Sequence, residues 1–288
     1  MRSSRGESAS GSVLPGRIAL EAVTDARGRT RLRSVRHSYP QRVAAPMYID
    51  DHHRGAAYLC VQSPSGGIFS DDSLETTVTV DTGAHLILAT QAATQVFAGP
   101  GPGAQHRLTF DVRDGALLEY LPKTVIPQAG SRYFQTTSVS LAGTGTVVAW
   151  DAVAAGRIAH GERFAYDRLI AATTVSVDGE ITVRDRLDLH PARCGDTNVA
   201  RLIGADYFAT FLVLTRAAAG PAVLTAVRAA VNSMPHLTGG VSALPGGCGV
   251  ITRLLADRAS DLRPARHRLL STARAAVLGT GHVPPGIL

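Results

Sequence analysis

The chain has 288 residues, of which 45% are apolar and 18% are charged. This composition supplies enough apolar side chains for a large core and excludes a globally disordered protein. Basic residues exceed acidic ones, for a net charge of +6, but the arginines are scattered and Lys123 is the only lysine. Nucleic-acid-binding proteins usually cluster their positive charge, so the sequence argues against that class.

The first residues differ in composition from the rest of the chain. Residues 1–12 are rich in Ser, Gly and Arg and lack the apolar segment of a secretory signal. We expect a disordered tail there, followed by a single domain over residues 13–288. Within this domain, residues 13–200 should form a β-rich scaffold and residues 201–288 a C-terminal part with helices.

Apolar stretches and cysteines bear on cellular location. The most apolar later stretch, residues 207–214, is too short to cross a bilayer, so we expect no membrane association. Cys60, Cys194 and Cys248 are widely spaced and odd in number, which argues against a disulfide framework. A cytoplasmic location fits this cysteine usage best.

Strand patterns dominate the first two thirds of the chain. Residues 18–23 and 30–35 predict two strands around a turn, and residues 56–62 predict a third. A strand–turn–strand unit then recurs four times. Its turn glycines lie roughly 30 residues apart, at Gly83, Gly115, Gly145 and Gly179.

Each repeated unit is typical of an antiparallel β-hairpin with a glycine at positive φ. A single hairpin cannot bury its apolar face, so the units should stack or pair into extended sheets. This predicts a mainly β, β-superhelix-like fold. An ordinary antiparallel sandwich with regular hairpins fits the same pattern.

The last third predicts two α-helices. Pro221 suits a first helical turn, and Val223, Leu224, Val227 and Val231 follow at helical spacing. Residues 261–278 predict the second helix, which Gly279 should end. Glycines at 239–240 and 246–247 predict a loop between the helices. The apolar faces could serve a partner interface or simply pack against the sheets.

Several kinds of chemistry find no support in the sequence. His52 and His53 are adjacent, so in a strand they would point to opposite faces, and no other metal-ligand spacing is present. The sequence therefore predicts no stable metal site and no bound cofactor. A Gly-x-Ser-x-Gly elbow and a phosphate-binding loop are also missing, so no catalytic residues are predicted.

Carboxylates and a polar strip are the more informative features. Asp71, Asp72, Glu119, Asp151 and Glu162 occur at predicted strand ends or in loops. Glu119 lies in an apolar run, where a charge is costly unless it is partnered or hydrated. It could point outward from a half-exposed strand, act in an acid–base pair, or help to line a cation path.

Two further segments suggest contact surfaces. Thr90, Gln91 and Thr94 form a polar strip at the end of an apolar run, which favours a polar surface or passage. Arg157 and Glu162 lie between glycines, where they could form a solvated turn or a rigid patch for another protein.

Four motifs in order resemble the UreD (UreH) family of urease accessory proteins. They are Gly66-Gly67 with Asp72-x-Leu74, then Thr90-Gln91-Ala92-Ala93-Thr94-x-Val96-Phe97, then Leu118-Glu119-Tyr120-Leu121-Pro122 with Ile126-Pro127, and Gly156-Arg157-x-Ala159-x-Gly161-Glu162-x-Phe164. The resemblance is strong over residues 17–191 and continues faintly to Gly279. Asp71-Asp72 replaces the usual Gly-Asp of the family, which leaves open a divergent paralogue with other partners.

The resemblance implies a non-enzymatic scaffold. Such proteins bind UreF and, through it, the GTPase UreG, and the hetero-oligomeric assembly docks on apo-urease to help nickel insertion. A passage for nickel in transit is implied, with Asp72, Thr90, Glu119 and Glu162 as its candidates. Arg157, Gln91 and Thr94 are the partner-contact candidates. A carbohydrate-acting β-solenoid enzyme with paired carboxylates is the alternative from the enzyme class.

Overall fold

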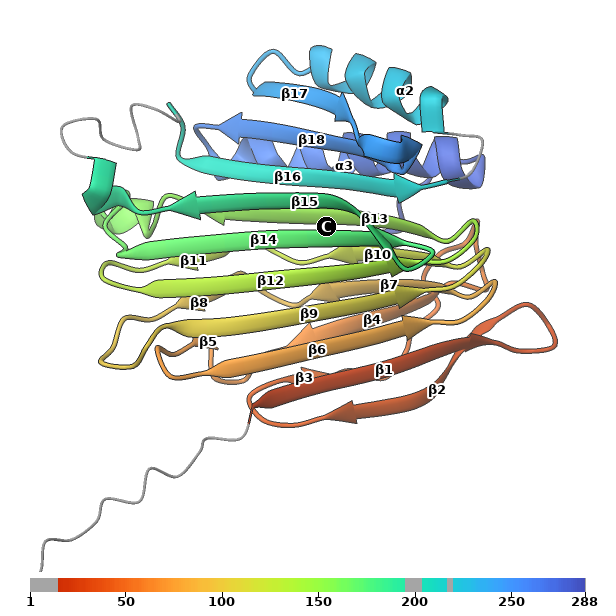
Figure 1. Ribbon diagram of the computed structural model, residues 1–288, viewed down its shortest axis with the longest axis horizontal. Coiled ribbons are helices and arrows are strands. Elements are labelled where there is room, and N and C mark those ends of the chain that lie inside the picture. The colour runs from red at the N-terminus through yellow and green to blue at the C-terminus, as the bar shows by residue number, and fades with distance from the viewer. Residues whose placement is uncertain (1–14, 195–203, 217–219, 288) are drawn as a thin grey trace, which may run out of the picture.

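A computed structural model of the protein describes residues 15–194, 204–216 and 220–287 (Figure 1). The predicted class, mainly β with two helices in the C-terminal third, is confirmed. The predicted tail over residues 1–12 lies outside the described residues. So does the predicted division of the domain at residue 200, and both stay predictions.

Seven strands form an outer sheet, which Figure 1 shows stacked one above another. Its order is β15-β14-β12-β9-β6-β1-β2, with parallel pairing from β1 through β14 and antiparallel pairing at the edge strands β2 and β15. The strands are β1 (Gly16–Thr24), β2 (Thr30–His37), β6 (Ser73–Val80), β9 (Ala104–Val112), β12 (Arg132–Leu141), β14 (Arg168–Val177) and β15 (Glu180–Leu189).

An inner sheet lies behind the outer one, in the order β17-β18-β16-β13-β10-β7-β4-β3. Its strands are β3 (Arg42–Val43), β4 (Ala57–Gln62), β7 (His85–Thr90), β10 (Leu117–Leu121), β13 (Thr146–Ala154), β16 (Tyr207–Thr215), β17 (Thr238–Ala243) and β18 (Gly249–Ala256). A short parallel ladder joins β13 at the end of the molecule. Its members are β5 (Gly67–Ile68), β8 (Thr94–Val96) and β11 (Val125–Pro127).

Helices α2 (Gly220–Asn232) and α3 (Ala259–Leu278) cover the other face of the inner sheet, and both predicted helices are confirmed. Short 3₁₀ turns occur at η1 (Ile158–His160), η2 (Pro191–Cys194) and η3 (Pro245–Gly247). Val223 and Val227 of α2 and Leu269 of α3 are fully buried in one core with the inner sheet. The apolar helix faces therefore pack on the sheet.

The glycine turns connect the two sheets, and this differs from the predicted hairpins. Strands β6 and β7, β9 and β10, and β12 and β13 flank a turn, yet each pair is split between the outer and inner sheets. Each strand instead pairs in parallel with the equivalent strand of the next repeat, as β6 does with β9 and β7 with β10. Only β14 and β15 form a hairpin within their own repeat. The repeats thus stack as coils rather than as hairpins.

The predicted glycine conformation is confirmed in three of the four turns. Gly83, Gly115 and Gly179 have φ values of 69°, 63° and 89°. In the third turn Gly143, with φ 56°, adopts this conformation in place of Gly145.

Burial explains the two strand patterns in the sequence. The outer sheet has one face on the core and one in solvent, so β6 alternates between buried and more exposed residues. The inner sheet is covered on both faces, and β7 is accordingly buried without interruption from Leu86 to Ala89. The alternating pattern of β6 is therefore that of a strand in the outer sheet, and the continuous apolar run of β7 is that of a strand in the inner sheet.

The predicted loop between the helices is wrong at residues 239–240. These glycines belong to β17, an edge strand that pairs antiparallel with β18. Glycine is disfavoured in strands, which made the segment look like a loop. A Cβ at Gly239 would lie 2.5 Å from Leu254 Cδ2 and 2.9 Å from the Arg253 carbonyl, so close packing explains the small residue there.

Gly249 is the glycine whose replacement should damage the inner sheet most. It has φ 133°, and a Cβ would lie 1.9 Å from the Val213 carbonyl oxygen of the neighbouring strand. We expect Gly249→Ala to lower the free energy of unfolding by at least about 2 kcal/mol, measured by urea denaturation. Gly240→Ala is the matched control, because a Cβ there would meet no described atom within 4 Å. Equal effects of the two changes would contradict this account.

Candidate functional site

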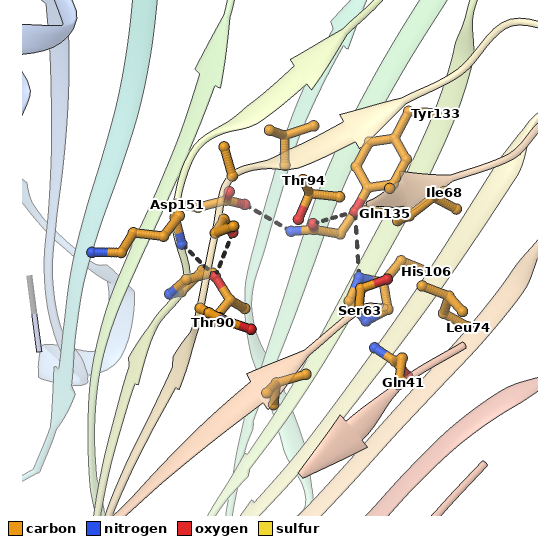
Figure 2. Close-up of a pocket in the computed structure, with 18 of the residues that line it drawn as sticks. Gln41, Ser63, Ile68, Leu74, Thr90, Thr94, His106, Tyr133, Gln135 and Asp151 are labelled. Carbon is orange, nitrogen blue, oxygen red and sulfur yellow. Dashed lines mark hydrogen bonds between the residues drawn. The ribbon is translucent and has the colours of Figure 1, made fainter. Parts of the chain in front are cut away.

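A cavity of about 110 Å³, lined by both apolar and polar residues, lies between the two sheets, next to the short ladder (Figure 2). Its volume is sufficient for several water molecules. Exposed residues Ser63, Gly66, Gln91 and Ala92 form part of its wall, so the cavity reaches the protein surface there. The inner wall is formed by residues of β7, β9, β10, β12 and β13: Thr90, His106, Tyr120, Tyr133, Gln135 and Asp151.

Inward positions of five strands supply the polar side chains of this wall. In β9, Leu108 and Phe110 face the core between the sheets, and the same alternation turns His106 inward. Gln135 is the direct cross-strand partner of His106. Asp151 occupies the equivalent face of β13. Near the ends of these strands the inward-facing side chains are therefore polar instead of apolar.

Hydrogen bonds join these side chains into one chain, which Figure 2 shows running from His106 through Tyr133 and Gln135 to Asp151. The Gln135 amide donates to Asp151 Oδ2 at 2.7 Å, and the Tyr133 hydroxyl donates to Gln135 Oε1 at 2.9 Å. Since this hydroxyl proton is engaged, its oxygen accepts from His106 Nδ1 at 3.4 Å. His106 Nε2 then accepts from the Thr76 hydroxyl at 3.2 Å.

Burial governs the charges in the cavity wall. It lowers the pKa of His106 to about 4, so this imidazole is neutral at physiological pH. Burial also raises the pKa of Asp151 above its ordinary value, although hydrogen bonds from Gln135 and the Ala152 amide and the charge of Arg253 oppose the shift. The tyrosine hydroxyl is neutral too, because burial raises the pKa of Tyr133 well above 10.

A second, separate cavity of about 40 Å³ is also lined by Asp151. Asp151 is the residue that the two cavity walls share. The second wall also contains Asp185, Thr210 and Arg253. The Arg253 guanidinium forms an ion pair with Asp185 and donates to the Thr210 hydroxyl. Polar groups therefore continue through the interior from the surface strip to this ion pair.

Three of the passage and partner-contact candidates named from the sequence line the first cavity. Thr90 closes β7; its hydroxyl donates to the Ala92 carbonyl at 3.2 Å and accepts from the Lys123 amide at 2.8 Å. Thr94 begins β8, and Gln91 lies between them at the surface. The polar strip recognised in the sequence is thus the mouth of the cavity.

Asp72, Arg157 and Glu162 lie outside the cavity wall. Asp72 accepts from the Phe69 amide at 2.8 Å in the loop before β6. Arg157 and Glu162 form a two-point ion pair, with Arg157 Nε 2.9 Å from Glu162 Oε2. The same Oε2 accepts from the Ala129 amide at 3.1 Å, so the pair fixes the loop after β13 to the loop after β11.

Glu119 lies on the opposite face of β10 from the cavity. Tyr120 faces the space between the sheets, while Glu119 is fully buried beneath α3. It accepts from His85 Nε2 at 2.6 Å and forms an ion pair with Arg274 of α3, which also pairs with Asp50. The interpretation of Glu119 as an outward residue on a half-exposed strand is wrong, because α3 covers this face.

The pKa of Glu119 reflects that cluster. Burial by itself raises it, but the hydrogen bonds and charges of His85 and Arg274 outweigh burial and lower it. The pKa of Asp50 is lowered in the same way, by the His53 amide and Arg274 acting against burial. Both carboxylates are therefore held in their charged form as part of the anchor for α3.

Sequence reasoning missed His106, Tyr133 and Gln135, and gave Asp151 no role in the passage. A signal was present, since each is a polar or amphipathic residue at an inward position of an alternating strand. Within the described ranges, no group of three or more His, Cys, Asp or Glu side chains is placed to hold a metal ion. No described helix has the length and apolar character needed to span a bilayer.

Comparison with known proteins places the chain in a family. The family described as UreD urease accessory protein matches residues 15–287. A urease accessory protein UreD of Mycolicibacterium gilvum (strain PYR-GCK) is 47% identical over 266 residues, covering 92% of this chain and 96% of that protein. The chain belongs to the UreD family. This confirms the resemblance predicted from the four motifs.

More distant UreD proteins match over similar lengths. The urease accessory protein UreD 2 of Streptomyces griseus subsp. griseus is 31% identical over 255 residues, covering 88% of this chain and 87% of that protein. A urease accessory protein UreD of Cenarchaeum symbiosum (strain A) is 28% identical over 278 residues, covering 94% of this chain and 97% of that protein. The UreD likeness therefore extends over most of the chain.

Proposed function

We propose that this UreD-family chain is a non-enzymatic scaffold for urease maturation, in which nickel passes through the interior between the two sheets. Membership of a urease accessory family supports the role in maturation. The observation that carries the proposed passage is the pair of separate cavities whose walls share Asp151. The proposed route begins at the strip of Thr90, Gln91 and Thr94 and passes from the first cavity to the second at Asp151.

The side chains along this route suit a cation in transit. Among the polar side chains oxygen ligands predominate, from hydroxyl, amide and carboxylate groups, with one neutral imidazole, and Lys123 is the one basic residue of the wall. Among the described residues lining the first cavity, Asp151 is the only carboxylate. Such a wall offers weak, exchangeable contacts, whereas a cluster of thiolates and imidazoles would hold the metal. Asp151 and Thr90 are accordingly the residues we assign to the passage.

The proposed assembly contains UreF, UreG and apo-urease in the cytoplasm. The Arg157–Glu162 pair supports a contact surface, because two charged hydrogen bonds hold its loop in one shape. Arg157 stays partly exposed, and Gln91 and Thr94 lie at the cavity mouth, where a docked partner could continue the route. These three residues remain the partner-contact candidates.

Co-expression with the urease structural and accessory genes of the same organism tests the proposal. We expect UreF and apo-urease to co-purify with the tagged chain, and deletion of its gene to abolish nickel-dependent urease activity. The metal content of purified urease, measured by mass spectrometry, should fall in parallel. Recovery of the chain alone, with urease activity unchanged on deletion, would instead favour a divergent paralogue with other partners.

A further inference from the structure

A surface pocket, distinct from the two interior cavities, adjoins the mouth of the first cavity and is lined in part by basic residues. Its volume is about 420 Å³, and it shares residues 91–93 and Lys123 with the wall of the interior cavity. The remaining wall comes from the residue before β11, from β13 and from the first turns of α3. It comprises Thr124, Trp150, Ala259, Leu262, Arg263 and Arg266. Three cations thus surround one opening.

Within the described part of the chain these cations have no acidic partner, since Lys123, Arg263 and Arg266 take part in no ion pair there. Arg266 is only 5% exposed, so it is a charge buried in the wall. Its Nη2 donates to the carbonyl oxygens of Leu121 and Ile287, at 2.7 and 3.2 Å, while its Nε has no hydrogen-bond partner in the described part of the chain. A buried guanidinium normally pairs with an anion.

The cations also act on one another. Burial, together with the charges of Arg266 and Arg263, lowers the pKa of Lys123, so both arginines repel the ammonium group. Burial lowers the pKa of Arg266 to about 10, which leaves this guanidinium charged at physiological pH. The pocket also contains the N-terminus of α3, where a helix carries partial positive charge. The N-cap residue Arg258 supplies no side-chain hydrogen bond to that end.

We propose that this pocket binds an oxyanion, a phosphate or carboxylate group, between Lys123, Arg263 and Arg266. An oxyanion would accept hydrogen bonds from the Lys123 ammonium and the Arg263 guanidinium and would offset the buried positive charge of Arg266. Trp150 and Leu262 provide an apolar wall on one side. This inference stands on the pocket itself and does not depend on the passage proposed for nickel.

Trp150 makes binding directly measurable, because it is the only tryptophan in the sequence. The tryptophan fluorescence of the purified full-length chain should change saturably as sodium phosphate replaces sodium chloride at constant ionic strength. In the variant Lys123→Gln/Arg263→Gln we expect affinity to fall on the order of tenfold or more, since two of three cations are lost. This variant retains Arg266, which holds two backbone carbonyls, so the fold should persist.

The matched control is Arg36→Gln, which removes one charge from an exposed position of β2, outside the pocket wall. It should bind phosphate as the unmodified chain does.

A blocked hexapeptide of glutamate, titrated in parallel, separates the two sources of an oxyanion. Tighter binding of phosphate assigns the pocket to a free ion, and tighter binding of the peptide assigns it to carboxylates of a partner protein. The proposal is overturned if neither probe saturates, or if Arg36→Gln weakens binding as much as the pocket variant.

Discussion

Replacing Arg274 with methionine is expected to lower the free energy of unfolding by about 3–5 kcal/mol, because it leaves two buried carboxylates without their shared counter-ion. Arg274 is 1% exposed and pairs with Glu119 of β10 and with Asp50. These ion pairs hold α3 against the inner sheet, although the paired residues are far apart in the sequence. Urea denaturation followed by circular dichroism would measure the loss.

A combined variant separates the charge effect from packing. Asp50→Asn/Glu119→Gln/Arg274→Met removes all three charges, so it should recover a large part of the stability lost in Arg274→Met alone. Arg228→Met, on the exposed side of α2, is the control for a change of the same kind outside the core. If the combined variant were no more stable than Arg274→Met, packing rather than unpaired charge would explain the loss.

The same cluster should make stability depend on acid. Asp50 and Glu119 have lower pKa values in the folded protein than in the unfolded chain, so the unfolded chain takes up protons first as pH falls. Their contribution is complete above the ordinary carboxyl pKa of about 4 and is lost as pH falls further, through the folded-state values. The unmodified chain should therefore lose more stability below pH 4 than the combined variant, in urea denaturations repeated across this range.

Replacing Asp151 with asparagine is expected to reduce nickel delivery without destabilising the protein. A unit charge pair 4 Å apart is worth about 4 kcal/mol at an effective dielectric constant near 20, and about 1.4 kcal/mol corresponds to tenfold. We therefore expect the initial rate of nickel-dependent urease activation to fall on the order of tenfold or more. The assay is activation of apo-urease by the reconstituted accessory assembly at limiting nickel.

Stability distinguishes this effect from misfolding. Burial raises the pKa of Asp151, which means that the folded state disfavours its charge, so Asp151→Asn should leave the free energy of unfolding unchanged or higher. Asparagine can still accept the hydrogen bond from Gln135. Asp111→Asn, on the solvent face of the outer sheet, is the matched control and should activate urease normally. Normal activation by Asp151→Asn would remove Asp151 from the proposed passage.

Much of the secondary structure was predictable because the sequence records local burial. Strand positions, both C-terminal helices and the stop at Gly279 follow from periodicity and from glycine and proline chemistry, which act within a few residues. Thr90, Gln91 and Thr94 were recognisable because polar residues interrupt an apolar run. Inward-facing His106 and Gln135 carried the same kind of signal within their strands.

Strand pairing was not predictable in the same way. A glycine turn between two apolar strands fits a hairpin and a connection between sheets equally well, because both place the strands antiparallel in direction. The choice depends on whether β6 bonds to β7 or to β9, which lies a full repeat away. Such long-range hydrogen bonds leave no mark on the local alternation of residues.

The sequence by itself determined the family, the mainly β class, the two helices and the polar strip at the cavity mouth, since each depends on local pattern or on motif order. Only the tertiary structure decided that Glu119 anchors α3 while Asp151 faces the cavity. Both are acidic residues in apolar strands, and their roles differ because each faces a different layer. The surroundings of a strand residue depend on what packs against its face of the sheet. For Glu119 this is α3, a helix more than a hundred residues away in the sequence, and for Asp151 it is the outer sheet.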